Sequence, residues 1–212
     1  MFFRSERLFL RPGWPEDWAD LFRQIADAAI VHNLARAPWP YGAGDARAFA
    51  ALPQDRRFPH FFITLPQTSG GAELIGCIGL HPGAGAASGE PGQVPESEHP
   101  PELGYWIARE RWGQGYATEA GRAVLAIART LGHRLVRANH FVDNAASGRV
   151  LAKLGFRPTG ACEPRFSVGR GEMAPAQVHL LHLAGAAGGG DDDHDLGGNG
   201  SGGAPAPMSR AA

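Results

Sequence analysis

Hydrophobic residues recur along this chain at two spacings, one typical of strands and the other typical of helices. The run around Leu8 and Leu10 predicts a first strand, which Pro12 ends because proline cannot continue a strand ladder. Trp18, Leu21 and Ile25 then recur at helical spacing, so one side of a helix should face the core. The N-terminal part is therefore expected to form a strand followed by an amphipathic helix.

The same spacings continue beyond this helix and predict a domain that mixes strands and helices. The expected order is β-α-α-β-β-β-α-β-α-β-β, which favours a three-layer α/β (α+β) domain with helices on both faces of a largely antiparallel sheet. The later elements are a short helix beginning near residue 45, strands at 61–65, 74–80, 102–107 and 135–141, helices at 117–131 and 143–154, and final strands at 156 and at 178–183.

Two segments lack hydrophobic periodicity. Residues 82–100 are mostly Gly, Pro, Ala, Ser and Glu, which predicts a long and mobile surface loop. Residues 185–212 are rich in Gly, Ala and Asp, which predicts a disordered tail after a folded domain of residues 1–184. The acidic run at 191–195 is interpreted as solvated rather than as a metal site, because its glycine-rich flanks cannot hold ligands in place.

Composition excludes several classes of protein. The 212 residues carry a formal net charge of -1, which gives no general attraction to nucleic acid. Two cysteines cannot build a disulfide framework, and Cys77 lies in an apolar run typical of a core. No stretch approaches the roughly 20 apolar residues that span a membrane. With no signal-peptide pattern near residue 1, a cytoplasmic protein is expected.

Residues 106–120 contain the most informative motif. An apolar strand is followed by Gly113 and Gly115, and these lead directly into a helix rich in Ala, Val, Leu and Ile. Backbone N–H groups at such a helix N-terminus have no partner within the helix and can surround an anion, assisted by the helix dipole. The predicted ligand is a phosphate or pyrophosphate. The alternative is a tight turn without a ligand.

Residues 112–117 read Trp-Gly-Gln-Gly-Tyr-Ala and resemble motif A of the GNAT acetyltransferases, Gln/Arg-x-x-Gly-x-Gly/Ala. Gly115 and Ala117 match the pattern, whereas Trp112 stands where Gln or Arg is usual. A tryptophan at this position, together with the preceding run at 102–107, makes this sequence similar to the RimJ/RimL-type branch of the family. The resemblance spans about residues 5–184. It implies the GNAT fold, whose fourth and fifth strands, here 102–107 and 135–141, splay apart to admit acetyl-CoA.

Cofactor contacts are expected at the start of the long helix. The backbone N–H groups of Gln114, Gly115, Ala117 and Thr118 are candidates for the pyrophosphate, and the Thr118 hydroxyl is a further donor. An ordinary first-turn residue is the alternative for Thr118.

The resemblance also implies contacts along the splayed strand. Backbone amides at Tyr105, Trp106 and Ile107 would bind the pantetheine arm and the thioester oxygen. By the same resemblance, Asn144 contacts the pantetheine or the acceptor. A plain helix N-cap is the alternative for Asn144.

Amine acetylation needs a base for the acceptor and an acid for the departing thiolate. Glu102, at the start of the splayed strand, is the candidate base, acting directly or through a water, and a solvated strand-end carboxylate is the alternative. Many GNAT enzymes use a tyrosine as the acid, but the matching residue here is Leu151. RimL-like members use a serine nearer the helix start, and Ser147 occupies that place.

The sequence thus predicts an acetyl-CoA-dependent N-acetyltransferase that acts by direct transfer in a ternary complex. The first choice of acceptor is a protein N-terminal α-amine, and a small-molecule amine is the nearest alternative. A non-catalytic acyl-CoA-binding regulatory module also stays open. The glycine spacing matches neither the Rossmann nor the P-loop fingerprint. A homodimer is compatible with the sequence, which does not determine the oligomeric state.

Overall fold

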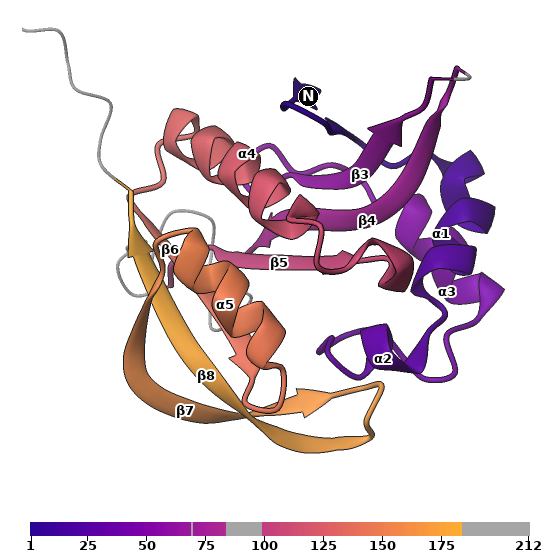
Figure 1. Ribbon diagram of the computed structural model, residues 1–212. Coiled ribbons are helices and arrows are strands. Elements are labelled where there is room, and N and C mark those ends of the chain that lie inside the picture. The colour runs from indigo at the N-terminus through magenta and orange to yellow at the C-terminus, as the bar shows by residue number, and fades with distance from the viewer. Residues whose placement is uncertain (69, 84–98, 184–212) are drawn as a thin grey trace, which may run out of the picture.

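The computed structural model describes residues 1–68, 70–83 and 99–183 (Figure 1). One eight-stranded sheet runs through the molecule in the order β1-β2-β3-β4-β5-β6-β8-β7. Of the described strand pairs, only β5 and β6 run parallel. The strands are β1 (Phe3–Arg4), β2 (Phe9–Arg11), β3 (His60–Pro66), β4 (Ala72–His81), β5 (Glu102–Ile107), β6 (Leu135–Phe141), β7 (Arg157–Ser167) and β8 (Glu172–His182).

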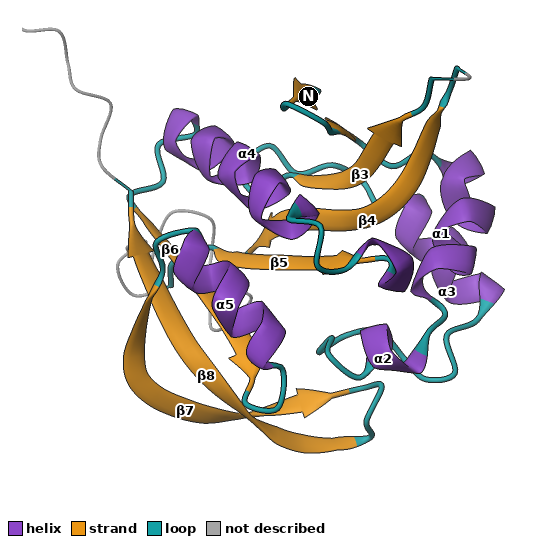
Figure 2. Cartoon of the chain, in the orientation of Figure 1, coloured by secondary structure: helices purple, strands orange, loops and turns teal. Residues whose placement is uncertain are grey.

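Helices cover both faces of the sheet, as the order of elements predicts. Helices α4 and α5 lie across one face, and α1 and α3 pack at the other (Figure 2). The helices are α1 (Trp18–Ile25), α2 (Ala28–Val31), α3 (Ala43–Ala50), α4 (Tyr116–Thr130) and α5 (Ala145–Lys153), with short 3-10 turns η1 (Pro15–Asp17) and η3 (Arg109–Arg111). The architecture is the mixed, largely antiparallel α/β fold expected from the sequence.

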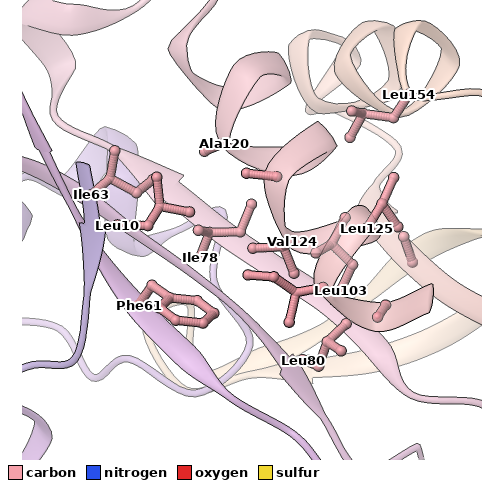
Figure 3. Close-up of a cluster of buried hydrophobic side chains, with 14 of the residues drawn as sticks. Leu10, Phe61, Ile63, Ile78, Leu80, Leu103, Ala120, Val124, Leu125 and Leu154 are labelled. Carbon is pink, nitrogen blue, oxygen red and sulfur yellow. The ribbon is translucent and has the colours of Figure 1, made fainter. Parts of the chain in front are cut away.

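Alternating residues on the central strands supply two separate cores. On β3, Phe61 and Ile63 join the core beneath α4, whereas Phe62 between them joins the core beneath α1 and α3. Ala120 and Val124 lie one helical turn apart on α4 and pack onto the first of these cores (Figure 3). Burial on both faces therefore fixes the register of the sheet, because a shift of one residue would exchange the two cores.

Strands β5 and β6 diverge. Their pairing is limited to two positions, Glu102 with Arg137 and Leu103 with Ala138, which lie at the start of β5 and in the middle of β6. Beyond these positions the two strands separate, so β5 faces an open gap from Gly104 onwards. These are the fourth and fifth strands of the sequence-based order, and β1, which that order lacks, shifts their numbering by one.

The C-terminal hairpin is longer than the sequence pattern indicates. Strand β8 begins at Glu172 rather than at residue 178, and β7 continues to Ser167. Prolines in both strands argue against strand structure at the level of sequence, yet Pro164 and Pro175 lie opposite each other in the β7–β8 pair. Pro175 lies one residue beyond the β6 ladder, which ends at the pair Phe141 with Ala176, so its missing N–H removes no bond within that ladder. Its carbonyl still accepts a hydrogen bond from the Val142 N–H at 3.0 Å.

Smaller differences occur near the N-terminus. The α2 turn was not expected, since its four residues are too few for helical spacing to be visible. Asp27 caps this turn by accepting a hydrogen bond from the backbone N–H of Ala29. The short helix begins at Ala43 rather than near residue 45.

Two expectations fall on residues outside the described part of the chain. They concern residues 84–98 of the predicted loop and the predicted tail at 185–212. Within the described residues, none of the helices combines the length and the apolar character that crossing a membrane requires.

Candidate functional site

The N-terminus of α4, with the loop that precedes it, forms what we call the α4 mouth, residues 113–118. Gly113 and Gly115 have φ values of 74° and 84°, in the left-handed region that favours glycine. Gly115 is the N-cap, and no side chain of the described residues caps the helix. The first intrahelical bond described there joins the Glu119 N–H to the Gly115 carbonyl, so the preceding N–H groups are available to an anion.

Charge at the α4 mouth is set by a contact with the N-terminal segment. Arg7 forms an ion pair with Glu119 at 2.7 Å, and its guanidinium also donates to the Gln114 carbonyl at 3.2 Å. Burial raises the pKa of Glu119, but hydrogen bonds from Arg7 and Ser5 outweigh it and lower that pKa. The carboxylate in the first turn is thereby paired, and Arg7 brings positive charge to the place where an anion would bind.

Trp112, the departure from the family pattern, fastens this loop to the sheet. Its indole N–H donates to the Ile107 carbonyl at 2.7 Å. That carbonyl lies at the end of β5, next to the open gap. The tryptophan therefore fixes the distance between the α4 mouth and the splayed strand, which a long ligand would have to span.

Tyr105 and Ser147 meet across the gap on the α4 and α5 side of the sheet. The Tyr105 hydroxyl and Ser147 Oγ are 2.8 Å apart. Burial raises the pKa of Tyr105 to about 12, so its hydroxyl stays protonated at neutral pH. The sequence pointed to Ser147 and to the backbone of Tyr105, but not to the side chain of Tyr105. A tyrosine at an inward position of the splayed strand is the signal that could have indicated it.

Asn144 is the N-cap of α5. Its Oδ1 accepts a hydrogen bond from the Ser147 N–H at 3.2 Å. The Nδ2 group of Asn144 has no acceptor among the described residues and can serve a ligand. The capping role and a ligand contact are therefore compatible, because they use different atoms of one amide.

Glu102 lies on the other face of the sheet. Alternation along β5 places it with Trp106, which packs beneath α1, and opposite to Leu103. One carboxylate oxygen pairs with Arg165 at 2.6 Å, and the other accepts from Asn139 Nδ2 at 3.0 Å. Glu102 is thus at the closed end of the gap, at the last positions where β5 and β6 pair, and it is oriented by two neighbours.

His81 completes a group that we call the Glu102 cluster: Glu102, Asn139, Arg165 and His81. It is the strand partner of Glu102, and a Cβ placed on Gly104 would lie 3.1 Å from its Nε2. Burial, followed by the charge of Arg36, lowers the pKa of His81 to about 4, although Glu102 opposes this. The imidazole is therefore neutral at pH 7. Sequence reasoning missed His81, Asn139 and Arg165, which come from three different strands.

The wide end of the gap opens into a cavity of about 490 Å³ between α2, Trp112, Asp143 and the β7–β8 turn. Arg170 in that turn donates to the His32 carbonyl at 2.6 Å and to Asp143 Oδ2 at 2.7 Å. Ser167 Oγ also donates to the Leu34 carbonyl at 2.9 Å. The turn is therefore held against the α2 segment and forms one wall of the cavity.

Comparison with known proteins gives consistent matches. Residues 7–157 match the model of the acetyltransferase (GNAT) domain. The uncharacterized N-acetyltransferase YoaA of Bacillus subtilis is 35% identical over 115 residues, which are 54% of this chain and 57% of that protein.

Solved structures share the fold at lower identity. A GNAT-family acetyltransferase from Bacillus anthracis has a TM-score of 0.67 and 22% identity, covering 86% of this chain and 98% of its own. RimL, a ribosomal L7/L12 α-N-protein acetyltransferase in complex with coenzyme A, has a TM-score of 0.65 and 17% identity, with the same two coverages.

Proposed function

Because the chain belongs to the GNAT acetyltransferase family, we propose that it transfers an acetyl group from acetyl-CoA to a primary amine by direct attack in a ternary complex. The thioester would supply an acyl group that an amine can attack. The observation that carries this proposal is the uncapped α4 mouth, whose glycines have positive φ at the end of a strand beside a gap.

Cofactor binding is assigned to backbone groups. The N–H groups of Gln114, Gly115, Ala117 and Thr118 are suited to a pyrophosphate, since no described side chain caps the helix there. The edge of β5 at residues 105–107 faces the gap without a β6 partner and can pair with the amides of a pantetheine arm. Asn144 caps α5 through Oδ1, and its Nδ2, which has no acceptor among the described residues, is a further donor for the cofactor.

Acid and base roles are assigned to opposite faces of the sheet. Glu102 takes the proton of the acceptor amine, directly or through a water, and its pairing with Arg165 and Asn139 keeps it oriented. Ser147 protonates the departing thiolate, and the Tyr105 hydroxyl 2.8 Å away can replace its proton. Separation of the two roles suits an acyl group placed in the gap between them.

The acceptor we propose first is a protein N-terminal α-amine, as in the RimJ/RimL branch. The support is the likeness of residues 102–107 and 112–120 to that branch and the fold shared with RimL. The cavity at the wide end of the gap gives a chain end room to approach.

Action in the cytoplasm and the domain boundary at residue 184 stay predictions.

A panel of acceptors tests the proposal. Peptides with free N-termini and small amines are incubated with acetyl-CoA, and free thiol is measured, with the Glu102→Gln variant alongside. Thiol release that depends on a peptide α-amine supports the proposal. Thiol release only with small amines would mean that the acceptor is a small-molecule amine and not a protein N-terminus. Calorimetric binding of acetyl-CoA without release for any amine would instead indicate a non-catalytic acyl-CoA-binding module.

A further inference from the structure

Asn139 stands at the apex of the gap between β5 and β6. The last paired residues of these strands are Leu103 and Ala138, so Asn139 is the first residue of β6 beyond the pairing. Its side chain donates from Nδ2 to Glu102 Oε2 at 3.0 Å. It therefore shares the face and the immediate surroundings of the candidate base.

The orientation of this amide is fixed by chemistry. An ionised carboxylate only accepts hydrogen bonds, so Asn139 must present its NH2 group to Glu102 and turn its Oδ1 elsewhere. That Oδ1 is buried and has no hydrogen-bond donor among the described residues. The other such side-chain atom among those residues is Nε of Arg137, two residues earlier on the same strand.

A buried amide oxygen without a donor is unfavourable, because it has lost water and gained nothing in return. Bulk solvent does not reach the atom and no described residue supplies a donor, so either an ordered water or a ligand bound at the apex is needed to pair it. The reaction brings a group with N–H bonds to this place, since the acceptor nitrogen has to lie beside Glu102 to give up its proton.

We infer that Asn139 binds the acceptor nitrogen through Oδ1 and thereby selects primary amines; this rests on the proposed function. A primary amine carries two hydrogens, one for Asn139 Oδ1 and one for Glu102, while its lone pair stays free for attack. A secondary amine has a single hydrogen and must leave one of the two oxygens without a donor.

The contact also strengthens during the reaction. The lone pair of the amine forms the new N–C bond, the C–S bond breaks, and its electron pair leaves with the sulfur. The nitrogen becomes positively charged until one proton passes to Glu102. A hydrogen bond from a cationic N–H to the Asn139 oxygen is stronger than one from a neutral amine. Asn139 therefore stabilises the charge where it develops.

The test compares Asn139→Leu with Arg137→Gln, which removes the other unpartnered atom from the same face of the same strand. Propylamine and N-methylpropylamine are the probes, with acetyl-CoA and thiol release as the readout. We expect Asn139→Leu to lower kcat/KM for propylamine about 30-fold and Arg137→Gln to lower it less than about threefold. The wild-type protein should prefer propylamine, and Asn139→Leu should lose most of that preference.

Two results would overturn the inference. One is equal behaviour of the two variants. The other is an equal fall of kcat/KM in Asn139→Leu for propylamine and for N-methylpropylamine, because an unchanged preference would mean that Asn139 acts only through Glu102. Acetyl-CoA affinity, measured by calorimetry, should stay within about twofold in both variants and shows that they are folded.

A binding experiment keeps the inference separate from the proposed function. If the wild-type protein releases no thiol with any amine, the proposed function fails, but propylamine can still be titrated into the complex with coenzyme A. The side-chain NH2 signals of Asn139, identified by their absence in Asn139→Leu, should then shift with propylamine and not with 1-propanol. Signals that respond to neither compound would contradict amine binding at Oδ1.

Discussion

The α4 mouth and the Glu102 cluster lie beside the same strand, β5, but they are built in opposite ways. The α4 mouth is made from backbone groups of consecutive residues, with two glycines at positive φ and an uncapped helix. The Glu102 cluster is made from side chains of β4, β5, β6 and β7, which are far apart in the sequence. One part depends on local conformation and the other on the register of the sheet.

This difference predicts that the two parts fail differently. A change in local backbone conformation at the α4 mouth should weaken cofactor binding and leave the chemical step nearly intact. A change in one side chain of the Glu102 cluster should slow the chemical step and leave cofactor affinity unchanged. Variants that affected both quantities equally would break the comparison.

The largest effect is expected for Glu102→Gln. If Glu102 accepts the amine proton, kcat at neutral pH should fall about 100-fold, and acetyl-CoA affinity should be unchanged. Glu163→Gln is a matched control, because Glu163 on β7 is also paired with an arginine from another strand, Arg137 on β6. Steady-state thiol release measures kcat, and equal rates for both variants would remove Glu102 from the base role.

Gly115→Ala is expected to weaken acetyl-CoA binding about 30-fold, since the left-handed conformation costs alanine about 1–2 kcal/mol and the mouth would rearrange. Gly132→Ala is its control. Gly132 has a φ of 88° just beyond the other end of α4, and a Cβ there would meet nothing within 4 Å. Both variants should lose similar stability, while calorimetry should find normal affinity in the control. Normal affinity of Gly115→Ala for acetyl-CoA would contradict the assignment of the α4 mouth as the pyrophosphate site.

Ser147→Ala should lower kcat about tenfold, because a water would then protonate the thiolate and would do so less effectively than the positioned serine hydroxyl. Tyr105→Phe should give a smaller loss, since it removes only the hydroxyl that contacts Ser147 Oγ. The pKa of Tyr105 is raised by burial to about 12, so no loss of rate from tyrosine ionisation is expected between about pH 8 and 10. Full turnover by Ser147→Ala would assign thiolate protonation to solvent.

The smallest effect concerns stability in acid. Burial lowers the pKa of His81 from 6.5 to about 4, so between these values the unfolded chain binds a proton that the folded protein does not. Stability should therefore fall as pH drops through this window. His81→Asn should reduce the fall in Tm between pH 7 and pH 5, whereas His182→Asn, at an exposed position, should not. An identical fall in all three proteins would show that His81 does not titrate this way.

The sequence predicts features made by contiguous residues better than features made by side chains from different strands. Strands β5 and β6 were predicted with their observed bounds, and the α4 mouth was visible because its glycines and helix are contiguous. The family resemblance, and not a local pattern of residues, indicated Ser147 and Asn144. The prolines at 164 and 175 hid most of the C-terminal hairpin, because their tolerance depends on where the neighbouring ladder ends.

The partners of Glu102 had no local signal at all. Arg165 and Asn139 reach Glu102 only because β6, β8 and β7 follow β5 in that order within the sheet. Arg7 likewise reaches Glu119 and Gln114 only through the position of the N-terminal segment beside α4. Side-chain contacts of this kind depend on sheet order and register, and a single sequence does not reveal either.

The most direct test of the central claim is a crystal structure of this protein with coenzyme A. We predict that the pyrophosphate lies within hydrogen-bond distance of the backbone N–H groups of residues 114–118, and that the thiol lies in the gap between β5 and β6. A pyrophosphate bound elsewhere, or an α4 mouth filled by a side chain of the protein itself, would contradict it.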